Sequence, residues 1–210
     1  EIKMQMNTAV NRSPEAILQT NKVIKNTYML LSMTLIFSGV MAFVGTVSGI
    51  GHGIALMVDL VAIGLLWFVL PKTANSSAGI PVLFGITGLL GFGLGPILNH
   101  YLAVNPSIVT TALGGTGAIF LGLSGYALTT RKDFSFMGGF VMVGILVAFL
   151  AGIGALIFNL PTLSLAVSGM FVLLMSGFIL YQTSAMIHGG ETNYIMATVG
   201  LYVTIYNLFL

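Results

Sequence analysis

Seven stretches of this chain are apolar and nearly free of charge, and each is about 17 to 25 residues long. A helix rises 1.5 Å per residue, so roughly 20 residues cross a hydrocarbon core about 30 Å thick. Only 6% of the residues are charged and the mean hydropathy is +1.04, an apolar excess that a water-soluble domain of this size could not bury. The sequence therefore predicts an all-α membrane protein, a bundle of seven transmembrane helices surrounded by lipid.

The spans follow a polar N-terminal tail, residues 1–27, and fill residues 28–210 as one domain. Within the tail, Ser13, Pro14 and Glu15 have the order typical of a helix start. The chain stops inside an apolar run, so we expect a short further segment after Leu210. The predicted spans are residues 28–48, 52–70, 79–102, 106–129, 134–158, 161–181 and 194–210.

The Lys and Arg residues predict the orientation of the bundle, because these residues accumulate on the cytoplasmic side of short loops. The first, third and fifth connectors between spans contain none. We therefore predict a cytoplasmic N-terminus, and an odd number of spans then places the C-terminus on the opposite side. The cations lie in the tail and in the second and fourth connectors: Lys3, Arg12, Lys22, Lys25, Lys72, Arg131 and Lys132.

Composition also limits the chemistry. The chain has no cysteine, which excludes disulfides, thiolate metal sites and a cysteine nucleophile. A net charge of +2 does not favour a nucleic-acid partner, and no motif predicts a cofactor.

Small residues recur at helical spacing and predict close helix packing, since small side chains let backbones approach each other in a membrane. Gly95 and Pro96 lie inside the third predicted span, where proline removes a backbone hydrogen bond and should break or kink the helix. The small residues that we expect on packing faces are Gly45 with Gly49, Gly91 with Gly95, and the ladder Gly144, Ala148 and Gly152.

Asp59 is the one acid well inside a predicted span. A carboxylate at such depth costs at least about 2.5 kcal/mol, so a buried acid of this kind is a candidate functional residue. The alternatives are a hydrogen-bonded acid that supports the bundle, or one close enough to the outer interface to stay hydrated. Neither Lys nor Arg lies in any span to pair with it.

The last span carries a polar stripe, because Thr198, Tyr202 and Tyr206 repeat every four residues. Thr204 and Asn207 lie beside them. Such side chains either form hydrogen bonds between helices or line a water-filled vestibule.

The sixth connector brings His188 and Glu191 close together. Two possible ligands without a third favour a structural or partner contact over a metal site. Ser124, in the fourth span, has the glycine-rich surroundings of an intramembrane serine protease, but such a nucleophile needs a histidine base. His188 is the candidate base, and we expect it about two turns beyond the end of the sixth span.

Several segments together resemble the signature of the Bax inhibitor family, the transmembrane Bax-inhibitor-motif proteins. In the third and fourth spans these are residues 93–98 (GLGPIL), followed by Ala112, Thr116, Gly117 and Phe120. The pattern is most similar to the bacterial YccA-type branch of the family. The segments similar to that branch are residues 21–28 (NKVIKNTY), 72–75 (KTAN), 128–133 (LTTRKD) with 135–136 (SF), and 188–195 (HGGETNYI).

The resemblance implies a seven-helix protein of the bacterial inner membrane that binds and modulates FtsH, a membrane-anchored AAA protease. Other members are described as calcium leak channels that are gated by two aspartates on the last two helices. This chain has Gln182 and Thr204 at those positions, and neither side chain titrates near neutral pH. The proton-switched pair of those channels is therefore not available here.

The leading hypothesis is a non-enzymatic regulator that docks laterally against a membrane protease through small-residue helix faces. The main alternative is a leak pathway for calcium, protons or another cation, lined by Asp59 and the polar stripe. A further alternative is an intramembrane serine protease that uses Ser124.

Overall fold

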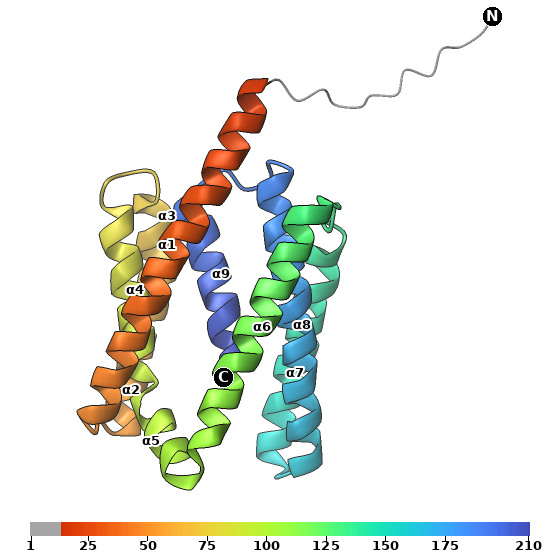
Figure 1. Cartoon of the computed structure of the whole chain (residues 1–210). Coiled ribbons are helices and arrows are strands. Elements are labelled where there is room, and N and C mark those ends of the chain that lie inside the picture. Colours follow the sequence, from red (N-terminus) through yellow and green to blue (C-terminus); the bar gives the residue numbers. More distant parts are fainter. Residues whose placement is uncertain (1–13) are drawn as a thin grey trace, which may run out of the picture.

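The computed structural model describes residues 14–210, and the elements in that range are helices (Figure 1). Six helical segments are long and apolar enough to cross a membrane, and one shorter apolar helix follows them, which confirms the predicted helical membrane bundle. The elements are α1 (Pro14–Val47), α2 (His52–Gly64), the π-helical turn η1 (Leu65–Val69), α3 (Leu70–Thr73), α4 (Gly79–Gly93), α5 (Gly95–Val104), α6 (Pro106–Thr130), α7 (Met137–Ile157), α8 (Pro161–Ile187) and α9 (Tyr194–Phe209).

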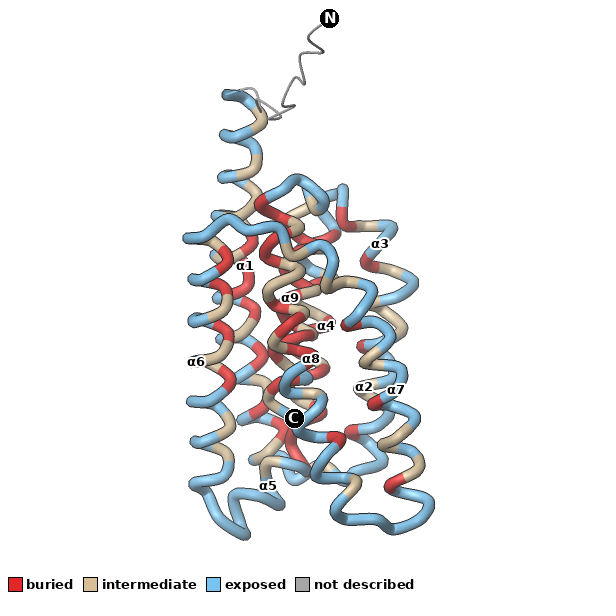
Figure 2. The backbone as a smooth tube through the Cα atoms, turned by 90° about the vertical axis from the view of Figure 1, so that its right-hand side faces the viewer, coloured by how far each residue is buried: buried red, intermediate tan, exposed pale blue. Residues whose placement is uncertain are grey.

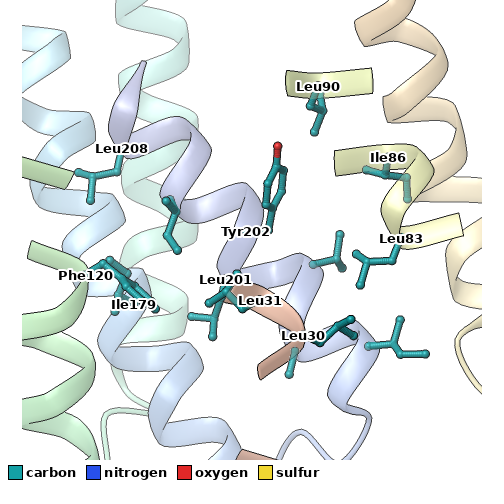
Figure 3. Packing of buried hydrophobic residues seen from close by; sticks show 14 of the residues in the cluster. Leu30, Leu31, Leu83, Ile86, Leu90, Phe120, Ile179, Leu201, Tyr202 and Leu208 are labelled. Carbon is teal, nitrogen blue, oxygen red and sulfur yellow. The ribbon is translucent and has the colours of Figure 1, made fainter. Parts of the chain in front are cut away.

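The last helix, α9, lies in the middle of the bundle. It packs against α1, α4, α6 and α8, and more than half of its residues are buried (Figures 1 and 2). With 16 residues it is about 24 Å long, shorter than α1, α6 and α8. Aliphatic side chains from α1, α4 and α8 surround it, and Figure 3 shows Leu31, Ile86 and Ile179 among them. α9 is therefore a core helix, whereas the outer helices expose most of their apolar residues to lipid.

The described part of the first helix starts at Pro14, the first residue that the structure describes. Residues 14–27, which the sequence assigns to the tail, form its first turns: the start of this segment extends beyond the bundle (Figure 1), whereas Thr27 is buried within it. Ser13 and the residues before it lie outside the described part of the chain. The prediction that the helix of the sixth span ends near residue 181 is wrong, because α8 continues to Ile187. Hydropathy marks the lipid-facing length of a helix, and α8 continues past that length through polar residues.

The third predicted span is broken as expected. α4 ends at Gly93 and α5 begins at Gly95, with Leu94 between them. The Leu94 N–H donates to the Gly91 carbonyl at 3.1 Å, a tighter turn than in an α-helix. The break follows from Pro96, which has no N–H to continue the α-helical pattern.

Small residues lie where backbones approach most closely. A Cβ on Gly91 would overlap the backbone of Ser38 in α1, and one on Gly95 would lie 2.6 Å from the carbonyl carbon of Gly45. In α7, a Cβ on Gly144 would meet the end of Leu174 in α8. These predicted packing faces are confirmed.

Gly49 does not belong to such a face. It lies in the turn after α1 with φ +59°, a conformation that glycine adopts without strain, and its Cβ position is open. The helix has already ended at Val47, so the periodicity that paired Gly49 with Gly45 no longer applies.

The described cations gather at one end of the bundle. Lys22 and Lys25 lie near the start of α1, Lys72 in α3, and Arg131 and Lys132 directly after α6, all at the end where α1 begins (Figure 1). We call this the basic end. It is the end that the charge pattern predicts to be cytoplasmic.

Candidate functional site

Tyr202 is the centre of a hydrogen-bond network within the membrane. Its side chain is 1% exposed, and its hydroxyl donates to the Thr87 carbonyl at 3.2 Å. The Ser38 hydroxyl oxygen lies 2.6 Å from the Tyr202 hydroxyl oxygen. Because Thr87 is in α4 and Ser38 is in α1, Tyr202 joins the central helix to both neighbours. Figure 3 shows the Tyr202 ring projecting from α9 on the side of Leu90.

Two threonines of the polar stripe also bond to other helices. The Thr198 hydroxyl donates to the Tyr194 carbonyl at 2.6 Å and to the Thr27 carbonyl of α1 at 3.3 Å. The Thr204 hydroxyl donates to Gln182 Oε1 of α8 at 2.9 Å. Asn207 bonds only within α9, to the Val203 carbonyl at 2.8 Å. Hydrogen bonding between helices therefore accounts for Thr198, Tyr202 and Thr204, but not for Asn207.

The bond between Gln182 and Thr204 joins α8 to α9 at the two positions where the resemblance places an aspartate pair in leak channels. Both side chains are uncharged at any physiological pH. Gly200, one turn before Thr204, makes room for the Gln182 amide, since a Cβ there would lie 2.8 Å from Gln182 Nε2. The pair is a buried neutral contact and not a titrating switch.

A cavity of about 480 Å³ opens between α1, α5, α6 and α9. This volume is within the range of small-molecule sites in proteins. Tyr202 and Tyr206 line it, whereas Asp59, Thr198, Thr204 and Asn207 do not. Most of the wall is aliphatic or aromatic, from residues such as Leu35, Leu98, Leu113 and Phe209. We call this space the apolar groove, and its walls do not match a water-filled vestibule.

Asp59 lies beside the α4–α5 break and is not among the residues that line the apolar groove. Its carboxylate rests directly against Gly93, so that any side chain on Gly93 would overlap it. Leu94, the next residue, lines the groove. Asp59 Oδ1 is buried and has no hydrogen-bond partner in the described part of the chain. Gly95 and Pro96, the other candidates at the break, are buried.

At the basic end, Ser184 joins the end of α8 to the connector after α6. The Phe134 N–H donates to Ser184 Oγ at 2.9 Å, and His188 Nδ1 lies 2.9 Å from the Ser184 carbonyl. Asp133 accepts hydrogen bonds from the side chain and the N–H of Ser135, and these bonds hold the pKa of Asp133 below its ordinary value. His188 adds a smaller electrostatic contribution in the same direction.

Asn193 joins the sixth connector to the connector after α3. Its side-chain oxygen accepts the Ile195 N–H at 2.9 Å and so caps α9, while its amide donates to Asn75 Oδ1 at 2.8 Å and to the Ala74 carbonyl at 3.2 Å. Glu191 Oε1 accepts the Asn193 N–H at 2.8 Å. Sequence reasoning missed Asn193 as an organising residue, although an Asn directly before an apolar run is a capping signal.

His188 and Glu191 line a second cavity at the basic end, of about 460 Å³, which Lys22 and Gln19 of α1 also line. Within the described residues, His, Cys, Asp and Glu form no group of three that could hold a metal ion.

Ser124 does not pair with a histidine. Its hydroxyl is buried without a hydrogen-bond partner among the described residues, and His188 bonds to Ser184 instead. His188 follows the last residue of α8 directly, so the expected gap of two turns is wrong.

The segments that resemble the YccA-type branch meet at the basic end, although they are far apart in the sequence. Residues 72–75 contact residues 188–195 through Asn75 and Asn193. Residues 21–28 approach α8 and α9, because Tyr28 Oη lies 3.4 Å from Thr183 Oγ1 and Thr27 accepts from Thr198. The remaining segment, residues 128–133 with 135–136, contacts α8 through the Lys132 carbonyl, which accepts from Ser184 Oγ at 3.4 Å.

The family model described as "Inhibitor of apoptosis-promoting Bax1" (Bax1-I) matches residues 20–210, which includes the described helices from the second turn of α1 onward. The chain belongs to the Bax1-I family. Because relatives of this family are named as inner-membrane proteins and six helices are long enough to span, it is a multi-pass protein of the inner membrane.

Three relatives show how closely the family members match. The chain is 49% identical over 195 residues to the "Modulator of FtsH protease YccA" of Escherichia coli K12, covering 92% of this chain and 89% of the relative. It is 47% identical over 199 residues to an uncharacterised membrane protein of Vibrio cholerae, covering 94% and 89% of the two chains. An uncharacterised protein of Pseudomonas aeruginosa is 46% identical over 212 residues, covering 100% and 93%.

Proposed function

We propose that this Bax1-I family member is a non-enzymatic inner-membrane regulator that binds and modulates a membrane protease of the FtsH type. The observation that carries the proposal is the 49% identity, over 92% of the chain, to a relative named as a modulator of FtsH protease. Identity at this level over nearly the whole length supports a shared partner as well as a shared fold.

The mode of binding follows from which small-residue faces remain open. The faces of α1, α4 and α7 described above are occupied by neighbouring helices. One face of α6 is not: its small residues are exposed, and a Cβ on its glycines would meet nothing within 4 Å. We call it the α6 face, and it comprises Thr111, Gly114, Ala118, Gly122, Gly125 and Thr129.

The α6 face suits a transmembrane helix of the protease. Its residues recur every three or four positions and lie on one side of the helix. Small residues on such a side allow a partner helix to approach closely, which is how helices associate where hydrocarbon provides no hydrophobic drive. The protease would dock laterally here, with the N-terminal extension of α1 within its reach at the basic end.

The effect on the protease follows from the packing of the bundle. Backbone contacts at Gly91 and Gly95 and the buried Tyr202 network hold α1, α4 and α9 together. A chain that is gripped at one end and resists being pulled apart occupies a protease without being processed rapidly. Modulation would then be competition with other membrane substrates.

Copurification from inner membranes tests the proposal. The tagged full chain should retain the FtsH-type protease, and so should a form without residues 1–13, in which every described helix is intact. If neither form retains the protease, the proposal fails. If both retain it but only the longer form slows the degradation of a second membrane substrate, the tail provides the modulation.

A pair of substitutions then tests the docking face separately. Gly114→Leu with Gly122→Leu places large side chains on the α6 face without an internal clash, and we expect the yield of copurified protease to fall several-fold. Val143→Leu with Val147→Leu is the matched control, since both residues are exposed on α7. If the two double variants retain equal amounts of the protease, the α6 face is not the docking surface. The proposal that the protease is the partner would still stand.

We do not extend the proposal to a cation leak. Such a pathway needs Asp59 and the polar stripe in one cavity, but the apolar groove contains Tyr202 and Tyr206 without Asp59. A serine protease activity through Ser124 has no supporting contact either, because His188 is bonded to Ser184.

A further inference from the structure

Asp59 is an acid within the membrane that lacks a counter-ion. It lies seven residues after His52, the first residue of α2, which places it roughly 10 Å along the helix from that end. The sequence has no Lys or Arg between Lys25 and Lys72. Lys72, the nearest cation along this helical segment, is about 20 Å further along it.

The carboxyl group of Asp59 packs against the backbone at Gly93. A Cβ on Gly93 would lie 2.8 Å from Asp59 Cγ and 3.0 Å from Oδ2, so the carboxyl group fits here only because Gly93 has no side chain. Oδ1 is buried and unpartnered in the described structure, and the neighbours Leu56, Met57 and Leu60 are exposed to lipid. An ionised carboxylate without partners is costly in such a place, and protonation removes that cost.

The elements packed against α2 supply no compensating charge. These elements are α4, η1 and α5. α4 and η1 contain no titratable residue, and His100 and Tyr101 of α5 are exposed near its far end. Tyr202 and Tyr206 of α9 are within electrostatic range of Asp59, but their hydroxyls are neutral at physiological pH. On α2 itself, His52 is two turns away and exposed.

We propose that Asp59 is a proton-binding site within the membrane, whose neutral carboxyl group rests against Gly93 beside the α4–α5 break. Release of the proton requires water to reach the break. Since Leu94 lines the apolar groove while Gly93 contacts Asp59, a displacement at the break changes both environments together. Protonation of Asp59 is therefore coupled to the shape of the apolar groove. This coupling does not depend on a protease partner.

Infrared spectroscopy of the full chain in vesicles of an ether-linked phospholipid, whose chains carry no ester carbonyl, tests this assignment. At pH 7.5 the wild-type spectrum should contain the C=O stretch of a protonated carboxyl group, and this band should be absent from Asp59→Asn. The Asp59→Asn spectrum assigns the band, because the other four acids, Glu1, Glu15, Asp133 and Glu191, are unchanged in that variant.

The wild-type spectrum alone decides the question, so a poorly folded variant does not leave it open. A missing band at pH 7.5 overturns the proposal, since Asp59 is then ionised and hydrated from the outer interface. A band that disappears when sodium chloride replaces choline chloride also overturns it, because the site then binds a metal cation in preference to a proton. Retention of the band in both salts supports it.

A second pair of variants tests the contact with Gly93. Gly93→Ala displaces the carboxyl group, and we expect the pH at which the band is half-lost to differ from the wild-type value. Gly85→Ala is the matched control in the same helix, because its Cβ position is open. Equal half-loss values for the two variants would overturn the role of Gly93.

Discussion

Two glycine-rich regions of this bundle use the same residue in opposite ways. Where α1 meets α4 and α5, a side chain on Gly45, Gly91 or Gly95 would run into backbone atoms of the neighbouring helix. In α6, positions such as Gly114 and Gly122 face open space. In the first region glycine allows helices to touch, and in the second it leaves a surface on which another helix could lie. In both regions the small residues recur at helical spacing in the sequence.

The comparison teaches that small-residue periodicity marks a potential contact and not an existing one. α7 is an intermediate case. It packs chiefly against α8, and those of its glycines that are covered meet side chains, such as Leu174, instead of backbone. The cost of adding a methyl group should therefore decrease from α4 to α7 to α6, and the following substitutions test that order.

Gly91→Ala should have the largest effect. Its Cβ would lie 2.9 Å from the Ser38 carbonyl carbon and 2.6 Å from Ser38 Oγ, so α1 and α4 must separate. We expect a loss of about 3 kcal/mol in the free energy of unfolding, measured by denaturant titration in mixed micelles. Unchanged stability would mean that the two helices are not in backbone contact.

Tyr202→Phe removes the hydroxyl that joins α9 to α1 and α4 without changing the packing of the ring. Ser38 and Thr87 each lose a partner. Hydrogen bonds between membrane helices contribute modestly, so we expect a loss of about 1 kcal/mol in the same titration. Ser38→Ala in the Tyr202→Phe background should then add little, and full additivity of the two losses would argue against a shared network.

Gly144→Ala adds a methyl group against the end of Leu174, which can rotate away. The expected loss in the free energy of unfolding is less than about 1 kcal/mol. Crosslinking yield between cysteines introduced in α7 and α8 would report whether the pair separates. A loss as large as that of Gly91→Ala would remove the distinction between the two interfaces.

Gly122→Ala should have the smallest effect, because nothing lies within 4 Å of its Cβ position. The free energy of unfolding should stay within about 0.5 kcal/mol of the wild-type value, as for other exposed positions. The same variant should weaken copurification of the protease if the α6 face is the docking surface. A marked destabilisation would instead place an internal partner on this face.

The transmembrane character of the chain could be predicted from composition and segment length, because the hydrocarbon thickness requires long apolar helices. The break at Pro96 could also be predicted, since its cause is local to the backbone. The prediction for the end of α8 failed because hydropathy reports contact with lipid, and the polar residues from Gln182 onward continue the helix beyond it. Asp59 was recognised as unusual from sequence, but its contact with Gly93 was not.

The polar contacts illustrate the limit most clearly. The stripe on α9 was visible from the spacing of Thr198, Tyr202 and Tyr206, whereas the partners Ser38 and Thr87 gave no signal of their own. A single serine or threonine in an apolar span is equally consistent with a bond to its own helix, as the contact between Ser32 and the Tyr28 carbonyl shows. Which of these hydroxyls crosses to another helix depends on how the helices are arranged.

The sequence by itself determined the solvent, the number of apolar spans and the end at which the cations gather, because each of these follows from local composition and from the energetics of transfer into lipid. The tertiary structure alone decided that α9 lies at the centre, that the small residues of α4 are covered while those of α6 are open, and that Asp59 rests against Gly93. The physical reason is that the neighbours of a helix are set by packing between segments that are far apart in the chain. Hydrocarbon surrounds every helix alike, so the hydropathy of a segment does not indicate which helix will pack against it.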